Sequence, residues 1–297
     1  MMVTGDVMNV GSLIGQREIK IVGEITNIAW CDGTFNPWWL CTEVGPGCRN
    51  CYAESLAKRY GYGWGQGAPR RFFGDKHWNE PLKWNEKAKR EGKKKKVFCA
   101  SMADWADNEV GQEHRDRLFA LIKKTDWLIW QLLTKRIGNA KKMLPEDWRN
   151  GNAPTNIWFG ITVVNQEEFD RDVPKLFELN FSVHWLSVEP QLGPINMTDN
   201  RNDIDWIANG IDWVVIGGES GPLDKVRPFD IGWARDGIRQ CRELRISCFV
   251  KQLGARTFME PKDGAPLFRT FSHAEAADPD RWPEDVRVRQ FPEWSYQ

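Results

Sequence analysis

Three cysteines, Cys41, Cys48 and Cys51, lie within eleven residues of one another, and a Gly-Pro-Gly stretch makes the chain between the first two flexible. Thiolates are soft ligands that favour iron or zinc over hard cations, and they are the usual ligands of iron–sulfur clusters. Three thiolates on a four-iron cluster leave one iron without a protein ligand, so a cofactor or substrate can bind that iron directly. We therefore predict that these three residues hold a [4Fe-4S] cluster.

Two other kinds of site fit the same cysteines. A structural zinc site needs four ligands, and Cys31 or His77 is then the candidate for the fourth. A thioredoxin-like redox pair needs only Cys48 and Cys51, and it leaves the third cysteine unexplained. The cluster accounts for all three thiols and is the interpretation that we prefer.

The remaining cysteines are predicted to be structural. Cys99 and Cys248 stand in apolar runs and Cys241 stands on a helix face, where a free cysteine behaves as a small core residue. Cys31 is expected to be structural too, with a position beside the cluster or a role as hydrogen-atom donor as the alternative. The odd total of seven cysteines favours a reducing compartment over a disulfide framework.

Short apolar runs recur along the chain with starts about 30 residues apart, which is the size of a strand–helix unit in a parallel α/β fold. These runs are Val97–Ala100, Leu128–Leu133, Ile157–Ile161, Val183–Leu186, Trp213–Ile216 and Cys248–Val250. A further strand is predicted around Phe35–Leu40, and helices are predicted at Tyr52–Tyr60, Glu113–Lys124 and Asp230–Leu244. Six or seven such units predict an α/β fold, either a full or a partial barrel.

Polar and small residues follow each predicted strand. They are Ser101–Asp104, Thr134–Arg136, Thr162–Asn165, Ser187–Pro190, Gly217–Ser220 and Lys251–Gln252. In an α/β barrel the residues just after the strands line the working face, so these side chains are predicted to surround a ligand. The competing interpretation is that loops are polar in any case and that each acid or lysine forms an interior ion pair.

Several of these motifs, in their order along the chain, resemble a phage-associated three-cysteine protein family of unknown function. The motifs are Thr34–Cys41, Gly47–Glu54, Leu133–Arg136, Ser187–Pro194, Asp212–Gly221 and Phe249–Gly254. This family occurs in phages and prophages and is grouped with the radical S-adenosylmethionine superfamily. The resemblance covers most of the chain, from about Ile28 to Gly254.

The resemblance implies a partial (β/α)6-type barrel with a [4Fe-4S] cluster in the loop after the first strand, held by Cys41, Cys48 and Cys51. It implies that S-adenosylmethionine chelates the open iron through its methionine amine and carboxylate. One-electron reduction by a flavodoxin-type or ferredoxin-type partner would then cleave this cofactor. The product would be a 5′-deoxyadenosyl radical, which takes a hydrogen atom from the substrate.

The resemblance also implies cofactor contacts at the strand ends. Ser101 and Asp104 are candidates for the methionine moiety, and Thr162 and Asn165 are candidates for the ribose. Further candidates for polar contacts to cofactor or substrate are Glu189, Gly217, Gly218, Glu219 and Lys251. Two features depart from the superfamily: six residues instead of three separate the first two cysteines, and the Gly-Gly-Glu motif follows a late strand instead of the second.

Residues 1–255 are predicted to form the barrel domain, and residues 256–297 are predicted to form a C-terminal extension that packs on it. The 41 basic residues balance the 41 acidic ones, so no net charge draws the protein to nucleic acid or to an anionic membrane. Met1–Gly23 has neither a bilayer-spanning run nor a signal-like start. We therefore expect a cytoplasmic protein without membrane contact, located in the host cytoplasm if a phage encodes it.

The phage association suggests a nucleotide or DNA base as the substrate, for example in a rearrangement that hypermodifies thymine. Basic residues interleaved with Trp78 and Trp84 would suit phosphates or single strands. These residues are Arg70, Arg71, Lys83, Lys87, Lys89, Arg90 and Lys93–Lys96. We favour a solvated surface for them. The alternative functions are a nucleic-acid-binding protein with a structural zinc or iron–sulfur site, and a cluster-bearing subunit that needs a partner for turnover.

Overall fold

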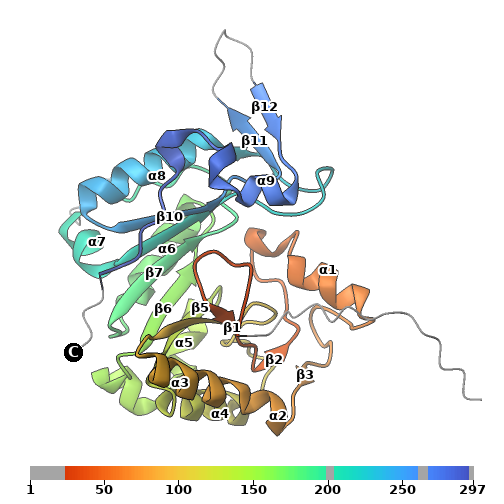
Figure 1. Cartoon of the computed structure of the whole chain (residues 1–297), viewed down its shortest axis with the longest axis vertical. Helices are drawn as coiled ribbons and strands as arrows, with labels where there is room; N and C mark the ends of the chain where they lie inside the picture. Colours follow the sequence, from red (N-terminus) through yellow and green to blue (C-terminus); the bar gives the residue numbers. More distant parts are fainter. Residues whose placement is uncertain (1–23, 199–203, 260–266, 294–297) are drawn as a thin grey trace, which may run out of the picture.

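The computed structural model of the protein describes residues 24–198, 204–259 and 267–293. A seven-stranded sheet forms its centre, and all neighbouring strands in it are parallel (Figure 1). In spatial order the strands are β1 (Gly33–Thr34), β4 (Lys95–Cys99), β5 (Leu128–Thr134), β6 (Ile157–Thr162), β7 (Val183–Val188), β8 (Trp213–Gly217) and β10 (Ser247–Gln252). This spatial order follows the chain, so the sheet is wound in one direction. The predicted α/β partial barrel is confirmed.

Helices connect the strands of this sheet. They are α3 (Glu80–Glu91), α4 (Gln112–Lys123), α5 (Ile137–Met143), α6 (Gln166–Leu176), α7 (Ile204–Gly210) and α8 (Ile231–Leu244). In α8 the buried side chains recur every three or four residues, at Ile231, Ala234, Ile238 and Cys241, as an amphipathic helix requires. The predicted helices Glu113–Lys124 and Asp230–Leu244 are confirmed to within one residue.

The two faces of the sheet carry two separate apolar clusters, because successive side chains of a strand point to opposite faces. Leu132 and Val214 pack with α4 and α8 in the larger cluster on the helix-covered face. Their strand neighbours on the inner face pack around Trp30, whose ring lies 5.3 Å from the ring of Trp185 and 4.7 Å from that of Phe98. The segment before β1 therefore fills part of the inside of the half-barrel with an indole.

The six apolar runs that were predicted as strands match β4, β5, β6, β7, β8 and β10 to within two residues. The strand predicted at Phe35–Leu40 is found only at Trp38–Trp39, and its place in the parallel sheet is wrong. Only Gly33–Thr34 joins the main sheet, while β2 (Trp38–Trp39) forms an antiparallel pair with β3 (Arg71–Phe72). Pro37 has no N–H to donate to a strand ladder, and Asn36 accepts a hydrogen bond from Met102 N at 2.7 Å, so the chain leaves the sheet here.

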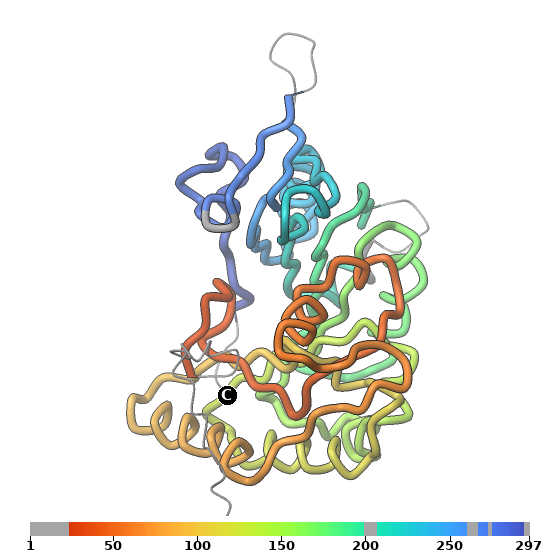
Figure 2. The backbone as a smooth tube through the Cα atoms, turned by 90° about the vertical axis from the view of Figure 1, so that its right-hand side faces the viewer, coloured from red at the N-terminus to blue at the C-terminus, as the bar shows by residue number. Residues whose placement is uncertain are grey.

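The C-terminal part of the chain packs against one end of the sheet. A hairpin of β11 (Arg256–Met259) and β12 (Leu267–Thr270) pairs with β9 (Phe229–Asp230) and projects from the molecule (Figures 1 and 2). After α9 (His273–Ala277), the chain runs antiparallel along β10, with Val250 N bonded to Val288 O at 2.8 Å and Gln290 N bonded to Cys248 O at 2.8 Å. The division of the chain at residue 255 stays a prediction.

Met1–Gly23, for which no membrane-spanning run was predicted, lies outside the described residues. Within the ranges that the structure covers, none of the helices combines the length and the apolar character that crossing a membrane requires.

Candidate functional site

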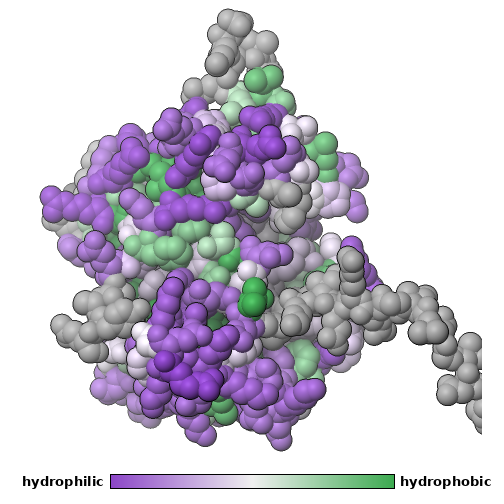
Figure 3. Space-filling view, viewed as in Figure 1, coloured by the Kyte–Doolittle hydropathy of each residue, from purple (hydrophilic) through white to green (hydrophobic). Residues whose placement is uncertain are grey.

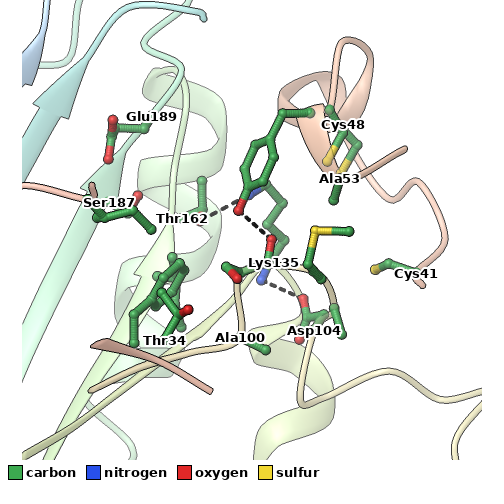
Figure 4. A pocket seen from close by; sticks show the side chains of 18 of the residues that line it. Thr34, Cys41, Cys48, Ala53, Ala100, Asp104, Lys135, Thr162, Ser187 and Glu189 are labelled. Carbon is green, nitrogen blue, oxygen red and sulfur yellow. Dashed lines mark hydrogen bonds between the residues drawn. The ribbon is translucent and has the colours of Figure 1, made fainter. Parts of the chain in front are cut away.

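A cavity of about 500 Å³ lies at the carboxyl ends of the parallel strands. Its wall combines the three clustered cysteines with residues at or just after the carboxyl ends of β4, β5, β6, β7 and β10. The predicted site residues that line it are Cys41, Cys48, Cys51, Ser101, Asp104, Thr162, Glu189 and Lys251. Figure 4 shows Cys41 and Cys48 on one side of the cavity, Ser187 and Glu189 on the other side, and Lys135 between them.

The cysteine loop, residues 41–51, runs from the end of β2 to α1 (Tyr52–Arg59), which confirms the helix predicted at Tyr52–Tyr60. A single 3-10 turn shapes it, with Cys48 N bonded to Gly45 O at 3.0 Å. Cys51 is the N-cap residue of α1, so the positive end of that helix lies at this thiol. Burial raises the pKa of Cys51, and the nearby ammonium group of Lys135 works against this shift.

Cys41 is held by Arg136, a residue that directly follows β5. The guanidinium Nη1 of Arg136 lies 3.3 Å from Cys41 Sγ and 3.1 Å from the Asp104 carboxylate. Its Nη2 donates to Thr42 O at 2.7 Å. Burial raises the pKa of Cys41 to about 11, Asp104 adds to this shift, and Arg136 opposes it. The buried cation is thus placed to stabilise a thiolate at Cys41.

The cysteine set fits an iron–sulfur cluster in its chemistry. All three thiols are free, only partly exposed, and on the wall of one cavity, beside the cations Lys135 and Arg136 and the N-terminus of α1. Among the described residues, no three His, Cys, Asp or Glu side chains are placed to hold a metal ion together. A four-iron cluster does not need such a group, because each thiolate binds a different iron.

The opposite side of the cavity carries a second group of polar side chains. Lys251, near the carboxyl end of β10, and Glu189, directly after β7, form an ion pair at 2.9 Å. The ammonium of Lys135 lies 3.3 Å from the hydroxyl of Thr162 (Figure 4). Arg136 and Lys251 are therefore neutralised by acids, whereas Lys135 meets a hydroxyl and presents a positive charge to the cavity.

Tyr52, directly after Cys51, also lines the cavity, and its hydroxyl donates to Ser101 O. Tyr52 was not predicted as a site residue, and Lys135 and Arg136 were predicted only as part of the strand end Thr134–Arg136, without a role of their own. The signal for the two cations was their position at the carboxyl end of an apolar run, which they share with Thr162 and Lys251. No comparable signal distinguishes Tyr52 from the other aromatic residues of the sequence.

Four predicted site residues are placed elsewhere. Among the described residues that line the cavity, Asn165, Gly217, Gly218 and Glu219 are absent. Asn165 is the N-cap of α6 and accepts a hydrogen bond from Glu168 N at 2.9 Å. The Glu219 side chain is buried and pairs with Arg227 and Asn50. A strand-end position alone does not direct a side chain into the cavity.

The two residues considered as a fourth zinc ligand are also engaged elsewhere. His77 Nε2 lies 2.8 Å from Asn36 O, and the ring stacks on Phe35 and Phe73. The thiol of Cys31 donates to Ile28 O at 3.8 Å, and burial raises its pKa.

The basic run interleaved with tryptophans does not form an aromatic binding surface. Trp78 and Trp84 are buried in the core, and Arg70 is buried in an ion pair with Asp107. The guanidinium of Arg71 lies over the ring of Trp39. Lys83, Lys87 and Lys89 are exposed on α3, and Lys93 is exposed just after it; the surface over α3 is strongly hydrophilic (Figure 3). This arrangement supports the solvated surface that we favoured.

A family model described as "Protein of unknown function (DUF5131)" matches residues 25–281. The chain belongs to this family. The match includes every strand of the parallel sheet and all the cysteines of the loop. No curated protein matches the chain.

Among solved structures, the chain is similar to spore photoproduct lyase complexed with dinucleoside spore photoproduct, with 11% identity, 88% of this chain and 74% of that chain covered, and a TM-score of 0.46. It is also similar to a double mutant of that lyase with bound AdoMet and dinucleoside spore photoproduct. That comparison gives 11% identity, coverage of 87% and 74%, and a TM-score of 0.48.

In this member of the family, Gly218 of the Gly-Gly-Glu motif allows the backbone after β10 to approach closely. A Cβ atom at Gly218 would lie 2.4 Å from Leu253 O, which belongs to rigid backbone. We expect Gly218→Ala to lower the free energy of unfolding by about 1–3 kcal/mol, because an inserted methyl group must displace that backbone. Gly193→Ala is the control, since a Cβ there meets no atom within 4 Å. Equal midpoints for both variants in urea denaturation would contradict this assignment.

Proposed function

We propose that the protein is a radical S-adenosylmethionine enzyme. In this proposal Cys41, Cys48 and Cys51 bind a [4Fe-4S] cluster, and S-adenosylmethionine occupies the adjoining cavity. The observation that carries the proposal is that three free thiols and the polar ends of the parallel strands line the same cavity. Carboxyl-end cavities are where α/β barrels do their chemistry. The motif resemblance to the phage-associated three-cysteine family supports the same function.

The residues of the chain would hold and shield these groups. The three cysteines would bind the cluster as thiolates, and Arg136, Lys135 and the N-terminus of α1 would stabilise its negative charge. The chemistry that a bound cluster would supply is one electron, received from a flavodoxin-type or ferredoxin-type protein, for the cleavage of S-adenosylmethionine to methionine and a 5′-deoxyadenosyl radical.

Three polar side chains of the cavity would have separate roles, which follow from their charges and contacts. Lys135 would bind the methionine carboxylate, because its ammonium meets only the neutral Thr162 hydroxyl in the contacts described above. Asp104 accepts hydrogen bonds from Thr134 Oγ1 at 2.7 Å and Lys135 N at 2.9 Å, so it would fix the end of β5. Thr162 would remain close to the ribose.

Lys135→Met is expected to weaken S-adenosylmethionine binding by about 10- to 100-fold while the cluster stays bound. The lost interaction is a hydrogen bond between two charged groups, which contributes about 1.5–3 kcal/mol. The measurement is a titration of the reduced cluster with the cofactor, followed by electron paramagnetic resonance. Lys142→Met, on the exposed surface of α5, is the control. An unchanged affinity in Lys135→Met would mean that another group binds the carboxylate.

We further propose that the substrate is a nucleotide or a DNA base, and that the reaction is a hypermodification such as a rearrangement at thymine. The phage association implied by the motifs supports this substrate. Glu189 lies on the far side of the cavity from Cys41 and Cys48 (Figure 4). With its ion-pair partner Lys251 it offers an acceptor and a donor that suit the polar edge of a base. Transfer of deuterium between a labelled nucleotide and 5′-deoxyadenosine would test the substrate directly.

The experiment that tests the enzyme proposal is anaerobic purification and reconstitution with iron and sulfide, followed by reduction with dithionite. We expect a reduced-cluster signal in electron paramagnetic resonance that shifts when S-adenosylmethionine is added, together with formation of 5′-deoxyadenosine. A cluster that does not respond to the cofactor would contradict the proposal. Bound zinc without a cluster would favour the nucleic-acid-binding protein with a structural metal site.

A further inference from the structure

We propose that Glu219, Arg227 and Asn50 form a clamp that positions the cysteine loop. This inference rests on the proposed function, since it concerns the placement of the cluster ligands. It assigns Glu219, the acid of the Gly-Gly-Glu motif, to a positioning role instead of a contact with the cofactor. The three residues of the clamp come from two parts of the chain that lie about 170 residues apart, as in the bond between Asn50 and Glu219.

The contacts of the clamp reach both sides of Cys48. Asn50 Nδ2 donates to Glu219 Oε2 at 2.9 Å and to Lys225 O at 2.9 Å. Arg227 Nη1 donates to Pro46 O at 2.8 Å. Pro46 precedes Cys48 by two residues and Asn50 follows it by two, so the segment after β8 holds the loop on either side of this ligand.

Glu219 is engaged by groups of the protein itself. Its Oε2 accepts from Asn50 Nδ2, from Arg227 N at 2.8 Å and from Arg227 Nε at 3.1 Å, while its Oε1 accepts from Arg227 Nη2. A carboxylate offers about four acceptor sites, and four donors are present. Among the described residues that line the cavity, Glu219 does not occur, although its neighbour Ser220 does.

The charge of Glu219 is buried but paired. Its exposed fraction is 6%. Burial acts to raise the pKa of the carboxyl group, but the hydrogen bonds from Arg227 and Asn50 outweigh it and hold this pKa below its usual value. A buried, paired charge is costly to separate from its partners, because either one would be left uncompensated. The clamp therefore ties a glycine-containing loop to the segment between β8 and β9.

The first test is made on the metal-free protein and does not depend on activity. Glu219→Gln keeps the size of the side chain and removes its charge. We expect the loop to open more often, so that amide hydrogen exchange in residues 45–51 and alkylation of Cys48 by iodoacetamide both rise by about 10-fold or more. Asn50→Ala removes only the partner on the loop and is expected to act in the same direction while Glu219 and Arg227 stay paired.

The matched control is Asp172→Asn. Asp172 is also a buried carboxylate with two cationic partners, Arg171 and Lys175, but it lies on α6. We expect this variant to leave exchange and alkylation in the cysteine loop unchanged. If neither Glu219→Gln nor Asn50→Ala changes them, the clamp does not exist.

The second test is iron content after anaerobic reconstitution. We expect Glu219→Gln and Asn50→Ala to bind less iron per chain than the wild type and than Asp172→Asn. A loosened loop with undiminished iron content would overturn the positioning role. If the variants loosen the loop but the wild type binds no cluster, the clamp is supported and the proposed function fails. Failure of the clamp and failure of the proposed function are therefore distinguishable.

Discussion

Replacing any one of Cys41, Cys48 and Cys51 by alanine is expected to reduce bound iron to background after anaerobic reconstitution. Each thiolate binds its own iron, and the loop holds these three cysteines on one cavity wall with no spare thiol among the described lining residues. Iron and sulfide analysis, together with the absorption of the reconstituted protein, measures the effect. The circular dichroism spectrum is expected to stay that of the folded wild type, because the loop contributes little to the core.

Cys31→Ala is the matched control for this experiment. Cys31 is also partly exposed, but it packs against the inner aromatic cluster and its thiol contacts Ile28 O. We expect it to retain the wild-type iron content. If Cys31→Ala lost the metal as the other three variants do, four cysteines would bind it. That result would favour a structural metal site over the three-cysteine cluster.

Replacing Asp107 by asparagine is expected to lower the free energy of unfolding by about 3 kcal/mol, because it removes the closest carboxylate from the buried Arg70 and leaves only Glu109, at 3.5 Å, to balance this charge. The two side chains are 0% and 2% exposed, and Arg70 Nε lies 2.8 Å from Asp107 Oδ2. Urea denaturation monitored by tryptophan fluorescence measures the change. The control is Asp147→Asn, which breaks the exposed pair with Lys123 and is expected to have little effect.

The same ion pair bears on the cysteine loop. Arg70 Nη2 donates to Thr42 Oγ1 at 2.7 Å, and Thr42 directly follows Cys41. We therefore expect Asp107→Asn to lower cluster content as well as stability. A variant that lost several kcal/mol of stability but kept full iron content would show that Cys41 is held by Arg136 alone.

The sequence was sufficient to predict the sheet because its strands are buried on both faces. Such strands read as uninterrupted apolar runs, as in β6, where all six residues are buried. The first strand could not be found in the same way. Its two residues, Gly33–Thr34, carry no apolar run, and the apolar residues that follow them belong to a separate antiparallel pair.

The sequence predicted those site residues whose roles depend on their own type and on their near neighbours in the chain. It did not predict residues whose side-chain contacts come from distant parts of the chain. Three closely spaced thiols indicate a metal site without further information. The positions of Thr162 and Lys251 at strand ends were enough to predict that they line the same cavity. Glu219 occupies a strand end too, but its side chain is engaged by Arg227 and Asn50. No local pattern in the sequence contains that information, because Asn50 lies far away along the chain.

The segment around Val288–Gln290 has a consequence for how copies of the protein meet one another. A strand at the edge of a sheet normally presents free N–H and C=O groups that can template a strand from another molecule. Along β10 these groups already bond to the C-terminal segment, through Val250 N and Cys248 O. A strand from another molecule therefore cannot pair with these groups of β10. A chain shortened before Val288 would expose them and become prone to aggregate.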